Sequence, residues 1–99
     1  MVSISTHVLD TAAGKPAKGV NVQLVRAGNG EECLASEWTD DDGRIASLAK
    51  DLEPGLYSLV FHPPSPFFTR VELQVELAEG HHHIPLLVSP YGCVTYRGS

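Results

Sequence analysis

Short stretches of alternating apolar and polar residues, separated by turn-forming residues, dominate this sequence. The clearest one runs from Val71 to Leu77, where apolar residues at every second position alternate with Glu72, Gln74 and Glu76. A period of two places one set of side chains on each face of a β-strand. No helical periodicity longer than about two turns appears in the 99 residues. The chain is therefore expected to be all-β.

The same pattern predicts further strands over residues 3–10, 20–25, 33–39, 56–61 and 81–88. Glycine, proline and aspartate mark turns or loops between them, at residues 12–19, 28–30, 41–43 and 78–80. Residues 45–51 fit either a short edge strand or one turn of helix. Trp38 is expected to be the large anchor of its strand.

Proline shapes the connection that follows residue 61. Residues 62–66 contain three prolines, which excludes a strand or helix interior because proline fixes φ and lacks a backbone donor. Short strands at a spacing of roughly 8–12 residues predict a two-sheet β-sandwich. A chain of 99 residues leaves room for a single domain, spanning residues 1–99.

Charge and cysteine content limit the partners and the compartment. The formal net charge of −5 argues against nucleic acid or an anionic membrane as a partner. No apolar stretch approaches the ~20 residues of a membrane span, and the first ten residues lack the basic and apolar regions of a secretory signal. Cys33 and Cys93 form neither a disulfide framework nor a close metal-binding pair. A reduced, cytoplasmic protein is expected.

Three consecutive histidines begin the last predicted strand. Alternation puts His81 and His83 together on one face, and His82 on the other with Ile84 and Leu86. The second face has the composition of a core, so His82 is expected in the core or at its rim. Two imidazoles two residues apart suit metal coordination or acid–base chemistry. A solvated strand end explains them equally well.

Two further candidates are weak when taken singly. His7 lies in the first strand on the face opposite Ile4 and Val8, and a lone strand histidine is more often structural than catalytic. Arg44 directly follows an Asp-Asp-Gly turn, where an arginine is usually a surface residue. Zinc needs three or four side-chain ligands, and no cysteine or acidic residue stands at a suitable spacing from the histidines. No metal is expected.

Together these pieces resemble the transthyretin-like family over nearly the whole chain. The opening resemblance is Ser5-Thr6-His7-Val8-Leu9-Asp10-Thr11, followed by Gly14, Pro16-Ala17 and Gly19-Val20. Its middle motif is matched from Thr39 to Arg44, and its closing signature from His81 to Ser99. The final Tyr96-Arg97-Gly98-Ser99 is the specific part, because in this family it marks the 5-hydroxyisourate hydrolase branch.

The resemblance implies a fold, an assembly and a reaction. The fold is a two-sheet transthyretin-like (prealbumin-like) β-sandwich of about eight strands. The assembly is a homotetramer, a dimer of dimers, with active sites in a channel where the dimers meet. The reaction is hydrolysis of 5-hydroxyisourate to 2-oxo-4-hydroxy-4-carboxy-5-ureidoimidazoline in urate (purine) degradation, without a cofactor. The alternatives are a non-catalytic protein that binds a small aromatic ligand, and an inactive structural relative.

The resemblance also implies roles for single residues. The positions that match catalytic residues are His7, Arg44, His83 and Ser99, and those that match substrate-binding residues are His81, Tyr96, Arg97 and Gly98. The chemistry fits, because a neutral histidine can take a proton from water and return one to a leaving nitrogen. A guanidinium can hold an electron-rich, partly anionic ring and stabilise charge on the attacked carbonyl. Which histidine is the base is left open.

Three departures from the family pattern stand out. His82 occupies a position that is usually aromatic. Cys93-Val94 replaces an aromatic residue and a small polar one, and Cys93 is expected on or near the channel wall. Residues 62–66 stand where relatives carry a short helix and a loop, so the usual helix is expected to be missing.

Overall fold

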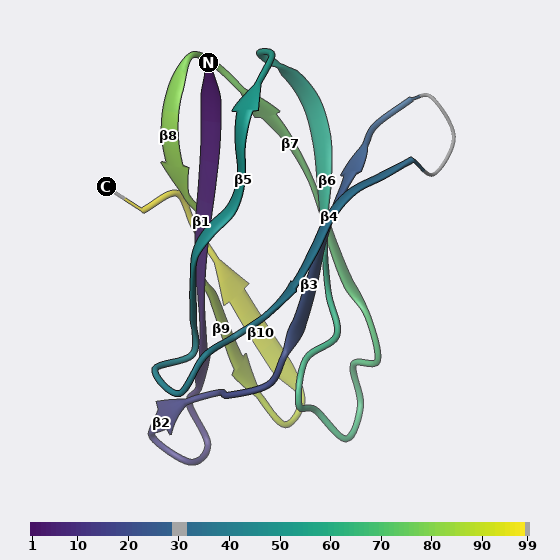
Figure 1. Cartoon of the computed structure of the whole chain (residues 1–99). Coiled ribbons are helices and arrows are strands. Elements are labelled where there is room, and N and C mark those ends of the chain that lie inside the picture. Colours follow the sequence, from purple (N-terminus) through teal and green to yellow (C-terminus); the bar gives the residue numbers. More distant parts are fainter. Residues whose placement is uncertain (29–31, 99) are drawn as a thin grey trace.

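The computed structural model describes residues 1–28 and 32–98, which contain ten β-strands (Figure 1). No helix capable of crossing a membrane occurs in these ranges. The strands are β1 (Val2–Asp10), β2 (Lys15–Pro16), β3 (Asn21–Arg26), β4 (Cys33–Trp38), β5 (Arg44–Leu52), β6 (Gly55–Phe61), β7 (Val71–Leu77), β8 (Gly80–His83), β9 (Leu86–Ser89) and β10 (Gly92–Thr95).

The strands form two sheets that face each other as two layers (Figure 1). One sheet has the order β10-β9-β1-β2, with β5 and β8 also paired to β1, and the other has the order β4-β3-β6-β7. This confirms the predicted two-sheet sandwich. The predicted number of about eight strands is met if the two-residue β2 is set aside and β8 and β9 are counted as one interrupted strand.

The first strand is the centre of its sheet. It pairs antiparallel with β5 and β2 along one edge, and parallel with β8 and then β9 along the other. Its alternation is as predicted, with Ile4, Thr6 and Val8 buried and the residues between them half-buried. Both edges of this strand are therefore paired within the chain, which fixes its position.

The core lies between the two layers. Its largest fully buried side chains include Ile4 from β1, Leu24 from β3, Tyr57 and Phe61 from β6, and Leu86 from β9. Burying an aliphatic or aromatic side chain of this kind contributes about 1.5–3 kcal/mol each. The core thus joins strands from both ends of the sequence.

The structure settles or corrects several expectations. Residues 45–51 belong to the strand β5, and the final predicted strand is interrupted at residues 84–85. Residues 12–19, expected to form a loop, contain the short strand β2. The expectation for Trp38 is wrong: its side chain is 67% exposed, because β4 is an edge strand and Trp38 faces away from the core. Of the turn predicted at 28–30, the last two residues lie outside the described ranges.

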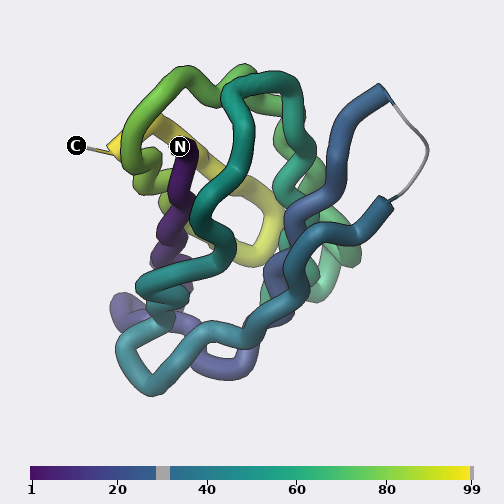
Figure 2. Tube along the Cα trace, turned by 45° about the horizontal axis from the view of Figure 1, so that its top comes forward, coloured from purple at the N-terminus to yellow at the C-terminus, as the bar shows by residue number. Residues whose placement is uncertain are grey.

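The connection between β6 and β7 is a loop without a helical turn, as expected (Figures 1 and 2). Ser65 organises it. The Ser65 hydroxyl accepts hydrogen bonds from the backbone N–H groups of Phe67 and Phe68, at 3.1 and 2.9 Å, and donates one to the Pro90 carbonyl at 2.9 Å. The proline-rich loop is therefore tied to the β9–β10 turn by a side chain.

A tight turn brings β5 against β1. Gly43 has φ of +72° and its carbonyl accepts a 2.7 Å hydrogen bond from the Val8 N–H. A Cβ atom at Gly43 would lie 2.5 Å from the Val8 carbonyl oxygen and 2.9 Å from Pro16 Cβ. Both the left-handed backbone and the close approach therefore require glycine here.

We expect Gly43→Ala to lower the free energy of unfolding by about 3 kcal/mol or more, from φ strain plus a backbone clash. Gly14→Ala is the matched control, since Gly14 has φ of +68° but no other atom within 4 Å of the place that an added Cβ would take. It should cost only about 1 kcal/mol. Urea unfolding of both variants at one protein concentration measures the difference, and equal losses would contradict the packing argument.

Candidate active site

The outer face of the β1 sheet collects the predicted site residues. Ser5 and His7 point outward from β1 because Ile4, Thr6 and Val8 occupy the inward positions. The parallel pairing with β8 sets Ser5 opposite His83, and the antiparallel pairing with β5 sets His7 opposite Arg44. Residues from the beginning, middle and end of the chain thus meet on one face.

Hydrogen bonding fixes the tautomer of His7. Its Nε2 lies 2.8 Å from the carbonyl oxygen of Asp42. A carbonyl only accepts, so Nε2 carries the proton and donates it. In the neutral ring Nδ1 is then left free to accept a hydrogen bond.

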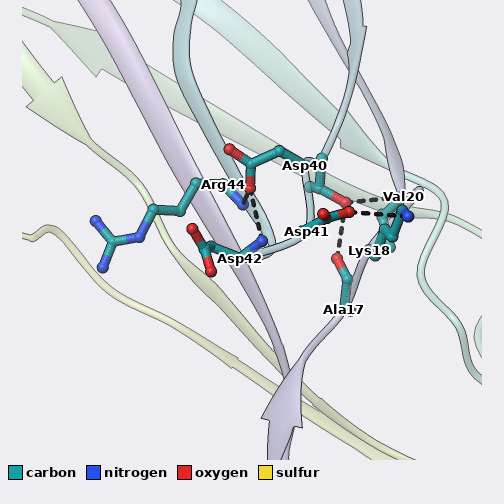
Figure 3. A network of polar contacts seen from close by, with 8 residues as sticks. Ala17, Lys18, Val20, Asp40, Asp41, Asp42 and Arg44 are labelled. Carbon is teal, nitrogen blue, oxygen red and sulfur yellow. Dashed lines mark hydrogen bonds and ion pairs between the residues drawn. The ribbon is translucent and has the colours of Figure 1, made fainter.

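The turn before Arg44 is held by Asp40. One carboxylate oxygen of Asp40 accepts hydrogen bonds from the N–H groups of Asp42 and Arg44, both at 2.9 Å (Figure 3). Figure 3 shows the Arg44 side chain extending away from this turn. Within residues 1–28 and 32–98, no ion pair joins its guanidinium to a carboxylate. The positive charge of Arg44 is available to an anionic ligand.

His83 is half-buried and is held at one ring nitrogen. Its Nδ1 lies 2.8 Å from the Ser5 hydroxyl. Burial, followed by the charges of His7, Arg44 and His81, lowers the pKa of His83 below its usual 6.5. The ring is therefore neutral at pH 7 and can act as a proton acceptor.

His81 extends the histidine row toward solvent. Its Nδ1 lies 2.7 Å from the Ser3 hydroxyl and its Nε2 lies 2.9 Å from the Ser5 hydroxyl. The side chain is exposed, in contrast to His82, which is 6% exposed on the core face and donates from Nε2 to the Ala78 carbonyl at 2.8 Å. The predicted division of the three histidines between two faces is confirmed.

The end of the chain returns to His83. The Gly98 N–H donates a 2.7 Å hydrogen bond to the His83 carbonyl, as part of an isolated antiparallel bridge. A Cβ atom on Gly98 would lie 2.6 Å from His83 Cδ2, so glycine lets the tail lie against the imidazole. Ser99 lies outside the described residues.

Tyr96 and Arg97 line a groove rather than the histidine row. This groove, about 570 Å³ in volume, opens between the edges of the two sheets and also includes Leu73, Val75 and His82. It contains none of the three residues His7, Arg44 and His83. Its volume makes it a candidate pocket, but the histidine face carries the groups that can transfer protons.

The expectation for Cys93 is not met. Cys93 pairs with Val88, whose side chain is buried in the core, so Cys93 shares the inward face at the sheet edge. Its neighbour Val94 pairs with Leu87 on the outer face and is 60% exposed. Val94 is therefore the residue of this pair that lies on the face of His7.

Three residues that shape the site were not predicted from the sequence: Ser3, Ser5 and Asp40. The two serines alternate with His7 along one face of the first strand, a signal that is present but generic. Their importance follows from the pairing with β8, which alternation does not reveal. For metal binding, no group of three or more His, Cys, Asp or Glu residues suited to an ion occurs among the residues that the structure describes.

The sequence and the fold are similar to those of known proteins. A 5-hydroxyisourate hydrolase of Caulobacter vibrioides is 41% identical over an alignment covering all of both chains. The structure is similar to that of Klebsiella pneumoniae 5-hydroxyisourate hydrolase, with a TM-score of 0.88, 39% identity and full coverage of both chains. It is also similar to sea bream transthyretin in complex with thyroxine, with a TM-score of 0.85, 25% identity and coverage of 96% of this chain and 93% of that one.

Residues 4–98 match the model of the HIUase/Transthyretin family. The match includes strands of both sheets together with His7, Arg44 and His83, and it extends to Gly98, the glycine that lies against His83. On this evidence the chain belongs to the HIUase/Transthyretin family.

Proposed function

We propose that residues 1–99 form one functional domain that hydrolyses 5-hydroxyisourate. Ring opening gives 2-oxo-4-hydroxy-4-carboxy-5-ureidoimidazoline, a step of urate degradation. The proposal is supported by relatives with this activity in their names at 37–42% identity. The observation that carries it is that Arg44, which has no carboxylate partner in the described ranges, and two histidines share one sheet face.

In the proposed mechanism His83 is the base. Its Nε2, the ring nitrogen that Ser5 does not hold, takes a proton from the attacking water. The same nitrogen then returns a proton to the ring nitrogen that leaves the carbonyl carbon. A neutral histidine suits both steps at pH 7. This proton transfer needs no cofactor.

Arg44 and His7 bind and orient the substrate. The guanidinium offers several donors in one plane to the oxygen atoms of the ring, and it stabilises the negative charge that develops on the attacked carbonyl. The free Nδ1 of His7 accepts a hydrogen bond from a substrate N–H or hydroxyl group. Ser99 is proposed to bind the substrate or orient the water, and His81, Tyr96, Arg97 and Gly98 to line the site.

We propose that the active unit is a homotetramer, a dimer of dimers, in the cytoplasm. An exposed apolar residue on the site face supports this assembly: Val94 is 60% exposed. Covering it with a second dimer would enclose the histidines in a channel and exclude water. The cytoplasmic assignment is supported by Cys33 and Cys93, which are exposed, unpaired thiols of the kind kept reduced there.

We expect Arg44→Ala to lower kcat/KM for freshly generated 5-hydroxyisourate by about 10²–10³-fold, because a donor to the developing charge is lost. The measurement is the ultraviolet absorbance of the substrate, corrected for its spontaneous decay. Arg70→Ala is the matched control, since Arg70 is exposed directly before β7 of the other sheet and pairs with Glu72. Tight binding of the substrate without turnover by the unmodified protein would favour the ligand-binding alternative.

The pKa of His83 gives a pH prediction. Because burial and neighbouring positive charge lower this pKa, activity should stay high as pH falls to 6.5 and decline only below it. The folded state also loses stability over that lower range, since protonation is disfavoured only in the folded protein.

Arg44→Gln removes one of the charges, so the pKa of His83 should rise. Proton NMR titration of His83 measures it, and Arg70→Gln should leave it unchanged; a fall in Arg44→Gln would contradict the assignment.

The assembly can be tested at Val94. Light scattering after size-exclusion chromatography should give four times the chain mass of 10.7 kDa. Val94→Asp should yield dimers, because burying an unpaired carboxylate between dimers costs several kcal/mol. Leu56→Asp is the control, since Leu56 is 44% exposed on the other sheet and should leave the tetramer intact. A monomer in the unmodified protein would rule out the proposed channel.

A further inference from the structure

An unbroken row of hydrogen bonds crosses the histidine face. Ser3 Oγ lies 2.7 Å from His81 Nδ1, His81 Nε2 lies 2.9 Å from Ser5 Oγ, and Ser5 Oγ lies 2.8 Å from His83 Nδ1. The parallel register causes this contact, since Ser3 stands opposite His81 and Ser5 opposite His83. Ser5 is the link that joins the two imidazoles.

The protons along this row have a consistent direction. A serine hydroxyl carries one proton, so Ser5 can donate to one ring while it accepts from the other. With both rings neutral, His83 donates from Nδ1 to Ser5, Ser5 donates to His81 Nε2, and His81 donates from Nδ1 to Ser3. Nε2 of His83 is then unprotonated and available as a base.

The two histidines differ in how well they can hold a positive charge. His83 is half-buried and lies beside His7 and Arg44, which oppose its protonation. His81 is exposed, and it lies two residues further from the position of Arg44 along the strands than His83 does. Two residues along a strand correspond to about 6.6 Å, and water stabilises a charge there. A proton taken up by His83 therefore has a better place on His81.

We propose that Ser5 is a positioning residue that couples His83 to His81, so that His81 stores the positive charge while His83 acts as the base. This inference rests on the proposed hydrolysis, in which His83 is the base. Ser5 and His81 then assist the base by moving and holding a proton, which is a different role from contacting the substrate.

Each proton in the proposed step is accounted for. As the water O–H bond breaks, an N–H bond forms at His83 Nε2, and the Nδ1 proton of His83 moves to the Ser5 oxygen. The original Ser5 proton moves to His81 Nε2, which leaves His81 as an imidazolium with Nδ1 still bonded to Ser3. When His83 Nε2 gives its proton to the leaving nitrogen, the two transfers through Ser5 reverse. No proton is gained or lost over the cycle.

Kinetics of Ser5 variants test this coupling. Ser5→Ala should lower kcat by about 10–100-fold with KM changed less than about twofold, because the base and not the binding is affected. Ser5→Thr keeps the hydroxyl and should restore kcat to within about threefold. Ser36→Ala, at an exposed serine on the other sheet, is the control that leaves kcat unchanged. Equal losses in the Ala and Thr variants, or a rise in KM alone, would overturn the proposal.

Solvent isotope effects add a readout that a merely structural role would not change. In mixtures of H₂O and D₂O, kcat of the unmodified protein should follow a curved dependence on deuterium content, because several protons move together. The dependence should become linear in Ser5→Ala. A linear dependence in the unmodified protein would show that a single proton moves and that Ser5 takes no part.

Nitrogen-15 NMR of the histidine rings separates this proposal from the function on which it rests. Removing the Ser5 hydroxyl should change the ring nitrogen shifts of His81 and His83 together, whether or not the protein turns over substrate. Unchanged shifts in Ser5→Ala would overturn the coupling. The two ring shifts could change together in Ser5→Ala while the unmodified protein does not accelerate the decay of 5-hydroxyisourate. That result would reject the proposed hydrolysis and leave the coupling through Ser5 in place.

Discussion

The parallel pairing of the first strand with the last part of the chain is the interaction on which the site depends. β1 contacts β8 and then β9, across a sequence separation of 78 residues. Inward residues from both segments, such as Ile4 and Leu86, are fully buried, and this burial holds the pairing in register. Once this pairing forms, outward residues of the two segments lie side by side, and no other interaction is needed to place Ser5 next to His83.

The other edge of β1 shows how a small irregularity positions a functional group. The pairing of β1 with β5 shifts register twice, between Val2 and Thr6. A regular ladder continued from Val2 and Leu52 would place Ser47 opposite His7. The extra residues in β5 place Arg44 there instead, and Gly43 lets the turn approach β1 closely enough to hold it.

The positive charge on the histidine face results from the way the turn before Arg44 is held. One carboxylate oxygen of Asp40 binds two backbone donors of the turn, and the guanidinium of Arg44 extends away from it (Figure 3). Burial of the His83 imidazole, and then the positive charge that this arrangement places beside it, lower the pKa of His83 and keep the ring neutral. An arginine able to bind an anion and a histidine able to accept a proton are thus two results of one arrangement.

Local alternation in the sequence is enough to predict the strand pattern and the faces of His7 and the three histidines, and the sequence motifs are enough to indicate the family. Alternation is local, so it assigns each residue to a face. It does not say which strand lies beside which, or at what register, because those depend on contacts between distant segments. The tertiary structure alone therefore decided that Arg44 stands opposite His7, that Ser5 bridges two imidazoles, that Cys93 faces inward, and that Trp38 lies on an edge strand in solvent.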